Sequence, residues 1–224
     1  MEVSNVVNIP SFFGSKIAKK LTFTDQGIKV ETAGPIIIIP AENINAFRYK
    51  VGWTRGYKFV FGRQYVIETK DFQNKIFEIK LNSIYGIKRK AYYEAWSKIY
   101  QLLWKYYFTS ALNYYAELYK INQVFEIAGV NFDTDGISWD KKNKLLWNEI
   151  AISNYRTYFM IYNANNIKQT KSCSFANDWN ASILQQIIKA VVKQQKQIAD
   201  TQEWNFTLSL PSAMPAPSNS HQQE

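Results

Sequence analysis

The chain has 224 residues, 46% hydrophobic and 20% charged, which suffices for one large domain or two of about 100 residues. Its single cysteine, Cys173, excludes an intramolecular disulfide, so we expect a reducing, cytoplasmic setting. No apolar run approaches the roughly 20 residues of a membrane-spanning helix, and the first residues lack the pattern of a signal peptide. The composition therefore predicts a soluble globular protein without a transmembrane segment.

The net charge of +9 is unevenly distributed. Residues 1–105 hold 17 Lys and Arg against 8 Asp and Glu, whereas residues 106–224 hold 10 of each. A basic half beside a neutral half indicates that the first half meets an anionic partner. The alternative is that scattered lysines simply keep this half soluble.

One short pattern occurs twice in the chain. Phe23 leads through an acidic turn to Gly27 and Ile28, and 109 residues later Phe132 leads through a similar turn to Gly136 and Ile137. Each copy predicts a strand, a tight turn closed by glycine and a returning strand. Because strand-like sequence and then an amphipathic helix follow both copies, we expect two copies of one α+β unit.

The first copy is predicted to contain about seven closely spaced strands, which is typical of a sandwich or barrel. The four isoleucines at 36–39 are too few for a helix and favour a strand buried on both faces. Two glycines bracket residues 52–56, so this segment predicts the connection of a hairpin. The strand candidates are residues 15–23, 28–31, 36–39, 44–51, 57–69 and 75–81.

The hydrophobic period then changes from that of a strand to that of a helix. Between residues 90 and 107 apolar side chains recur every three or four positions, which predicts an amphipathic helix; they are Tyr92, Trp96, Ile99 and Leu103. A second helical pattern runs from Phe108 towards Ile121. It links the two copies, either as a bent extension of the first helix or as a separate helix.

The second copy is shorter. Its strand candidates are residues 125–132, 137–140, 145–152, 155–162 and 168–175, and a helix with an apolar stripe follows at Ile183, Ile187, Val191 and Val192. Beyond it, residues 204–210 alternate as in a strand, which would add to a sheet edge or form a sticky tail. Residues 211–224 contain three prolines and predict disorder.

About seven short strands followed by one helix, together with the repeated Phe-x-x-x-Gly-Ile turn, resemble the pleckstrin-homology (PH) superfold over residues 12–107 and 124–196. The resemblance implies an α+β, mainly β fold with two PH-like barrels, each closed by a C-terminal amphipathic helix. The expected organisation is a basic domain at 1–107, a helical linker at 108–123, a near-neutral domain at 124–198 and a tail at 199–224.

Members of the PH superfamily bind proteins, peptides or lipid headgroups, usually without catalysis. Those that bind phosphoinositides carry cations around the first hairpin turn, whereas both turns of this chain are acidic, with Asp25 in the first and Asp133 and Asp135 in the second. An acidic turn repels phosphate, although Lys19, Lys20 and Lys29 flank the first one. We therefore do not transfer phosphoinositide binding to this chain.

The residues that catalysis needs are largely missing. His221, the only histidine, lies in the tail, so no Ser/His/Asp or Cys/His arrangement can form in the folded part. Cys173 lies in a strand pattern and is interpreted as a buried, inert thiol. One cysteine and a tail histidine argue against a zinc site, and Asp133 and Asp135 are interpreted as turn formers. We expect no enzyme, no cofactor and no metal.

The predicted binding site lies in the first copy. Trp53, Arg55 and Lys58 are close in sequence, with Arg48, Lys50 and Arg63 on the adjoining strands, and an exposed Trp beside Arg is typical of a binding hot spot. A second basic cluster comprises Lys88, Arg89 and Lys90. The alternatives are that Trp53 folds back onto its own domain and that both sets of cations are solvated.

The sequence thus predicts a non-catalytic binding or scaffolding module whose partner is a protein or peptide. The main alternative is peripheral association of the basic domain with anionic lipid, and a second is a small-molecule carrier with an aromatic-lined barrel. Nucleic acid is disfavoured, because the chain has neither an RNA-binding signature nor a basic recognition helix. The oligomeric state stays open.

Overall fold

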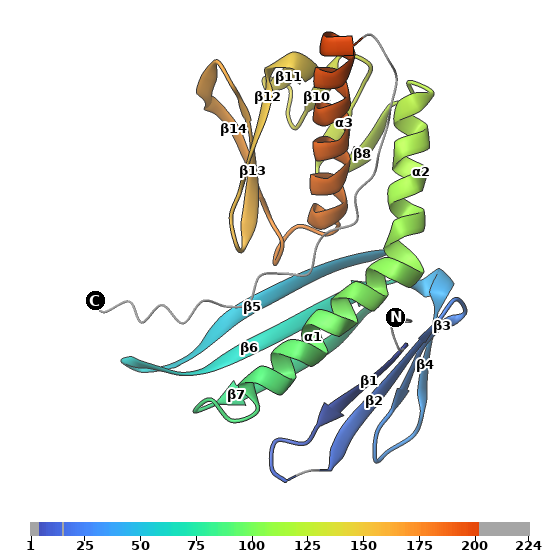
Figure 1. The fold of residues 1–224 in the computed structure, drawn as a ribbon, viewed down its shortest axis with the longest axis vertical. Coiled ribbons are helices and arrows are strands. Elements are labelled where there is room, and N and C mark those ends of the chain that lie inside the picture. Colours follow the sequence, from blue (N-terminus) through green and yellow to red (C-terminus); the bar gives the residue numbers. More distant parts are fainter. Residues whose placement is uncertain (1–4, 15, 202–224) are drawn as a thin grey trace.

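The computed structural model describes residues 5–14 and 16–201, with side chains as far as residue 195. In the N-terminal half, seven strands precede a helix: β1 (Val6–Pro10), β2 (Ile17–Thr24), β3 (Gly27–Glu31), β4 (Ile37–Pro40), β5 (Ala46–Gly56), β6 (Phe59–Lys70), β7 (Ile76–Ile84) and α1 (Arg89–Leu103). A 3-10 turn, η1 (Ala41–Asn43), separates β4 from β5. The strands form two antiparallel sheets, β1-β2-β3-β4 and β5-β6-β7 (Figure 1).

The C-terminal half repeats this order. Its elements are β8 (Phe125–Ile127), β9 (Val130–Phe132), β10 (Gly136–Ser138), β11 (Lys144–Leu146), the 3-10 turn η3 (Trp147–Glu149), β12 (Ile150–Asn154), β13 (Tyr158–Asn163), β14 (Asn166–Ser174) and α3 (Ala181–Thr201). The sheets are again one of four strands, β8 to β11, and one of three, β12 to β14. The order of four strands, a 3-10 turn, three strands and a helix therefore occurs twice.

The expectation of a mainly β chain with antiparallel sheets is confirmed, but the expected closed barrels are not found. Within the described residues the strands form four separate sheets. The 3-10 turns η1 and η3 divide each half, so β4 does not pair with β5 and β11 does not pair with β12. Instead of closing a barrel, the sheets and helices share one continuous hydrophobic core.

The repeated glycine turn has the same structural reason in both halves. A Cβ atom on Gly27 would lie 2.2 Å from the carbonyl oxygen of Ile39, and one on Gly136 would lie 1.9 Å from that of Leu145. In each half the residue before the glycine also accepts a backbone hydrogen bond from the first residue of the 3-10 turn, from Ala41 in η1 and from Trp147 in η3. The repeat thus positions the third strand, the fourth strand and the following turn together.

The helix between the halves is continuous but bent. α1 passes through a π-helical turn, η2 (Trp104–Phe108), into α2 (Thr109–Lys120), and the direction of the chain changes there (Figure 1). The Thr109 hydroxyl donates to the Trp104 carbonyl, and the Ser110 hydroxyl donates to the Tyr107 carbonyl. A bent extension of the first helix is therefore the alternative that the structure supports. Among the described residues no helix is long and apolar enough to cross a membrane.

The two halves join along the edge of β5. The Tyr49 amide donates to the Phe175 carbonyl at 2.8 Å, and the Asn180 amide donates to the Phe47 carbonyl at 2.9 Å. The rings of Tyr49 and Phe175 stack with centroids 5.1 Å apart. Trp179 lies under the Arg48 guanidinium, 4.4 Å from the ring centroid. The segment between β14 and α3 thus continues the β5 edge across the two halves.

The prediction that the isoleucine run is buried on both faces is wrong. Ile36, Ile37 and Ile38 are 57%, 48% and 69% exposed. Ile36 precedes β4, and β4 is an edge strand of its sheet. The predicted tail strand at 204–210 and the predicted disorder at 211–224 lie outside the described residues.

Candidate functional site

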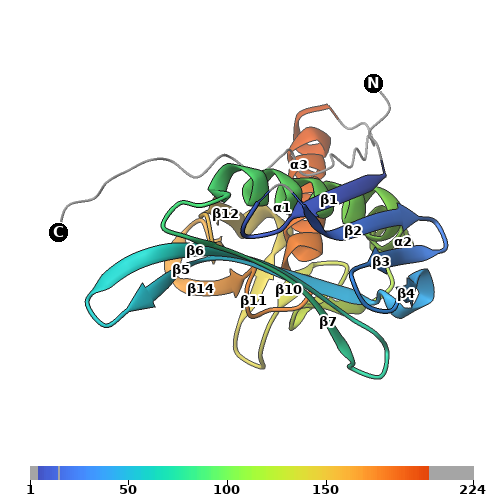
Figure 2. The same ribbon diagram turned by 90° about the horizontal axis from the view of Figure 1, so that it is seen from below.

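The β5–β6 hairpin is longer than the sequence predicts. Residues 52–56 are not its connection but part of β5, and the turn is formed by Tyr57 and Lys58. A register shift between Thr54 and Arg55 accommodates one extra residue on β6. The prediction that Gly52 and Gly56 bracket the connection is wrong, because the strands continue pairing through both glycines. Figure 2 shows the end of this hairpin projecting beyond the helices and the neighbouring strands.

The pairing register places three polar or aromatic residues side by side. Trp53 of β5 faces Arg63 of β6, and Arg63 in turn faces Ser83 of β7. Alternation along the strands puts this row on the same face as Tyr49, Tyr65 and Leu81, which are buried. The rings of Tyr49 and Tyr65 contact Trp96 of α1. The row therefore lies on the helix-covered face of the sheet, level with the first residues of α1.

Arg63 is the most unusual residue of this row. Its residue surface is only 2% exposed, and its guanidinium carbon lies 4.0 Å from the centroid of the Trp53 ring. The Nε and Nη1 atoms are buried without a hydrogen-bond partner among the described residues. Within that part of the chain no carboxylate forms an ion pair with Arg63. An arginine remains charged at neutral pH even when it is buried, so the site holds a positive charge that no carboxylate of the described residues balances.

The charges around Arg63 are positive as well. Burial lowers the pKa of Arg63 below its ordinary value, and the charges of Arg89 and Arg156 lower it further, while the Tyr65 hydroxyl offsets part of this effect. Arg89 is the first residue of α1. Arg156 belongs to the loop between β12 and β13, so the C-terminal half contributes to the positive potential at this site.

The loop between β7 and α1 closes one side of the site in a strained conformation. Tyr85 and Lys88, both non-glycine residues, have φ angles of 50° and 57°, and Gly86 has a φ of 77°. Left-handed conformations of non-glycine residues are costly and cluster at functional sites. Lys88 caps α1 without a side-chain hydrogen bond. The positive end of the helix dipole therefore adds to the charges of Arg63 and Arg89.

These elements enclose a pocket of about 240 Å³. It is lined by Trp53, Val60, Phe61, Gly62, Arg63, Ser83, Tyr85, Gly86 and Arg89. The Ser83 hydroxyl already donates to the Ile87 carbonyl at 2.9 Å. The two guanidinium groups are therefore the charged donors of a pocket whose remaining walls are mostly apolar, and the Trp53 indole N–H and the Tyr85 hydroxyl are its neutral side-chain donors. Such a pocket can bind a small anionic group.

Exposed aromatic rings lie at the pocket and along the hairpin beside it: Trp53 and Tyr85 line the pocket, Phe59 contacts Phe61 of its wall, and Tyr57 lies at the hairpin turn. Trp53 is 50% exposed, Tyr57 99%, Phe59 61% and Tyr85 76%. Large aromatic side chains with this degree of exposure are typical of surfaces that bind another molecule. Together with the pocket they form what we call the hairpin face: Trp53, Tyr57, Phe59, Arg63, Tyr85 and Arg89.

The structure brings together only part of the predicted site. Trp53, Arg63 and Arg89 meet in the pocket, and Arg55 lies near it on β5 with an exposed side chain. Lys58 is exposed at the hairpin turn, 5.5 Å from the centroid of the Tyr57 ring. The structure partly supports the alternative that Trp53 folds back onto its own domain. Its ring covers Arg63 but remains half exposed.

Four predicted residues lie elsewhere. Arg48 pairs with Glu68 and contacts Trp179, so it belongs to the junction of the two halves. Lys50 is exposed on the opposite face of β5. Lys88 supplies the backbone cap of α1, and Lys90 points to solvent, 3.9 Å from Glu94. Strand alternation and helical periodicity separate these cations from their neighbours in the sequence.

Sequence reasoning missed Ser83, Tyr85 and Arg156. Ser83, near the end of β7, is hydrogen-bonded to Ile87 of the following loop, and no local pattern marks it. Tyr85 stands next to Gly86 just before the predicted basic cluster, which was a usable turn signal. Arg156 comes from the other half of the chain, so only the tertiary structure could place it near Arg63.

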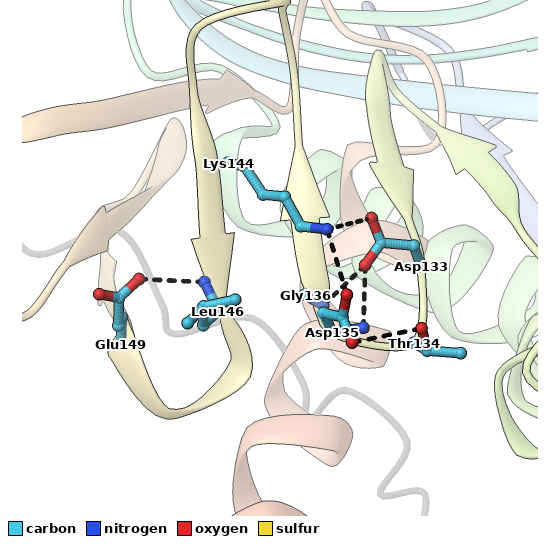
Figure 3. Close-up of polar contacts among 7 residues, drawn as sticks. All are labelled: Asp133, Thr134, Asp135, Gly136, Lys144, Leu146 and Glu149. Atoms are coloured by element: carbon cyan, nitrogen blue, oxygen red, sulfur yellow. Dashed lines mark hydrogen bonds and ion pairs between the residues drawn. The ribbon is translucent and has the colours of Figure 1, made fainter.

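The other residues that the sequence offered for chemistry, Cys173, Asp133 and Asp135, have structural surroundings. Cys173 is fully buried, and burial raises the pKa of its thiol to about 12, so it is a poor nucleophile. Asp133 accepts from the amides of Asp135 and Gly136, and the Lys144 ammonium lies 2.9 Å from Asp133 and 3.5 Å from Asp135 (Figure 3). Among the described residues no group of three His, Cys, Asp or Glu could hold a metal ion.

The chain matches no protein-family model, no curated protein and no solved structure. Its function must therefore be inferred from the chemistry of the pocket and its rim.

Proposed function

We propose that this protein is a non-catalytic binding or scaffolding module that contacts a protein or peptide through the hairpin face. We further propose that it consists of two PH-like domains, at 1–107 and 124–198, joined by a helical linker at 108–123. The twofold order of four strands, three strands and a helix supports this organisation. PH-like folds act as binding scaffolds, although a fold alone does not assign a function.

One observation carries the proposal: a buried arginine, without a carboxylate partner among the described residues, lies in a pocket that the exposed rings of Trp53 and Tyr85 help to line. Taking a charge out of water without a partner costs several kcal/mol, and exposed aromatics cost solubility. A surface that combines both features gains stability when a partner covers the rings and supplies the counter-charge. Trp and Arg are also the residues most enriched where binding energy concentrates.

A double substitution at the hairpin tests this proposal. Trp53→Ala with Arg55→Ala should reduce partner recovery in a cross-linking pull-down at least ~10-fold, because hot-spot residues each contribute about 2 kcal/mol or more. The melting temperature should stay nearly unchanged, since Arg55 is exposed and the loss of the half-exposed Trp53 ring admits water to the Arg63 charge that it covers. The matched control is Phe72→Ala with Lys75→Ala, which removes one exposed aromatic and one exposed cation at the opposite end of the same sheet.

Equal recovery with the hairpin variant and the control would contradict the proposal. The same proteins should also be sedimented with vesicles of neutral and of anionic lipid. Binding to anionic vesicles in the absence of any protein partner would favour peripheral membrane association instead. Lys16 and Lys19 near the exposed Ile17 and Ile36 are the residues through which such binding would act.

A further inference from the structure

We propose that the pocket beside Arg63 is a carboxylate site, which accepts an acidic group carried on an apolar stem. The acidic side chain of a partner protein, flanked by apolar residues, is the ligand that fits this description. This inference rests on the proposed function, because it names the chemistry by which the hairpin face recognises its partner.

The buried guanidinium of Arg63 is the first reason to expect a carboxylate. Asp133 and Glu68 show how this chain normally compensates charge, since each is paired with a cation of its own sheet. Arg63 is more deeply buried than either of them, yet it has no such pair among the described residues. A carboxylate in the pocket would place two acceptor oxygens beside the planar guanidinium, the geometry in which Arg binds most strongly.

The surroundings of Arg63 favour an anion independently. Arg89 lines the same pocket, Arg156 adds charge from the C-terminal half, and α1 directs its N-terminus to the loop that closes the pocket. The helix terminus is thus a second source of positive potential rather than the sole reason for the site.

The walls of the pocket distinguish a carboxylate from a phosphate. A phosphate dianion is satisfied by many donors around three oxygens, but the Ser83 hydroxyl is already engaged with Ile87. Val60, Phe61 and Tyr85 form the remaining walls, and these suit the carbon stem of an acidic side chain. The pocket therefore sets two guanidinium groups, the Trp53 indole N–H and the Tyr85 hydroxyl among mostly apolar walls, which suit a carboxylate on an apolar stem.

Small probes test the inference on the full-length protein. 3-Phenylpropionate should shift the NMR signals of the Trp53 indole and the Gly86 amide with saturable binding. 3-Phenylpropionamide, which has the same shape without the charge, should bind at least tenfold more weakly, and so should inorganic phosphate. Phosphate binding more tightly than the carboxylate, or equal binding of acid and amide, would overturn the assignment.

Substitution of the arginine gives a second test. Arg63→Met keeps the length of the side chain and should weaken 3-phenylpropionate binding at least tenfold, whereas Lys50→Met removes the same charge on the opposite face and should leave it unchanged. Because Arg63→Met removes an uncompensated buried charge, its melting temperature should equal or exceed that of the wild type. A lower melting temperature would show that the fold itself satisfies Arg63 and would overturn the inference.

The two proposals can fail separately. If no probe binds while Trp53→Ala with Arg55→Ala still abolishes partner recovery, the hairpin face is a contact surface but the pocket is not a carboxylate site. Arg89→Met provides an independent check, because it removes the second guanidinium without changing the row of Trp53, Arg63 and Ser83. It should weaken probe binding at least threefold.

Discussion

Asp133 and Arg63 both carry a charge out of full contact with water, but their surroundings differ. Asp133 accepts two backbone hydrogen bonds and pairs with Lys144 (Figure 3), so its charge is compensated within one hairpin. Arg63 has the Trp53 ring on one side and further cations nearby. A charge with an internal partner stabilises the fold, whereas a buried charge without an ion-pair partner costs stability.

The pH dependence of stability should report the compensation at Asp133. Partial burial raises the pKa of Asp133, but the Lys144 ammonium and the amides of Asp135 and Gly136 outweigh it and lower the pKa below 3.8. A lowered pKa in the folded state means stability that is present at neutral pH and is lost as the pH falls below about 4. Asp133→Asn should therefore be less stable than the wild type at pH 6.

The difference between the two proteins should shrink as the pH falls below about 4 towards 2, because the wild-type carboxyl takes up a proton and loses its ion pair. Urea unfolding at a series of pH values measures it. Because Asn can still accept from the backbone amides of the turn, this variant isolates the ion pair with Lys144. A stability difference that is the same at pH 6 and pH 2 would show that the ion pair does not contribute.

At the scale of elements, the acidic glycine hairpin is the part that the two halves share. Its glycine is needed because the carbonyl of the next strand occupies the place of a side chain, and the same turn receives the amide of the following 3-10 turn. The β5–β6 hairpin is where they differ: its strands have 11 and 12 residues, against 5 and 6 in β12 and β13, and it continues through Gly52 and Gly56 to an exposed turn. The common element positions the sheets, and the distinctive element carries the candidate site.

A substitution at the common hairpin should be much more damaging than at an ordinary loop glycine. Gly136→Ala would bring its Cβ to 1.9 Å from the Leu145 carbonyl oxygen, whereas a Cβ on Gly34 meets nothing nearer than 3.7 Å. We expect Gly136→Ala to lower the free energy of unfolding by about 2 kcal/mol or more and Gly34→Ala by less than about 0.5 kcal/mol. Denaturant unfolding compares them, and equal losses would contradict the role assigned to Gly136.

At the scale of the whole molecule, the two halves are joined through β5 and a shared core. The segment from Phe175 to Asn180 hydrogen-bonds to Phe47 and Tyr49, and Trp179 lies against Arg48 and Lys70. The same strand carries Trp53 nearer its other end. The junction between the halves and the candidate site are thus two stretches of one strand, and Arg156 approaches the site only because the halves are docked.

Weakening the junction should be visible at the amides that it protects. Trp179→Ala removes two cation–π contacts, each worth roughly 0.5–1 kcal/mol, and should destabilise the protein by about 1–2 kcal/mol. Hydrogen exchange at the amides of Phe47 and Tyr49 should accelerate, because both donate across the junction. Tyr114→Ala, at an exposed position on α2, is the control. Unchanged exchange at both amides in Trp179→Ala would contradict the docking role of Trp179.

The sequence by itself determined the features that depend on neighbouring residues. Hydrophobic period predicted the strands and the helices, including the buried stripe of Tyr92, Trp96, Ile99 and Leu103, and the glycine turn predicted the repeat. Local rules also located Trp53, Arg63 and Arg89 as binding candidates. The secondary-structure predictions hold because periodicity and turn chemistry act over a few residues, whereas the role of these three residues in binding stays a prediction.

Only the tertiary structure decided how distant residues combine. Pairing register aligned Trp53, Arg63 and Ser83, and the edge position of β4 left Ile36 to Ile38 exposed. Docking of the halves placed Trp179 against Arg48 and brought Arg156 towards the pocket. Register and docking depend on the packing of the whole chain, which no local pattern encodes. The uncompensated charge of Arg63 became visible only when every neighbour was in place.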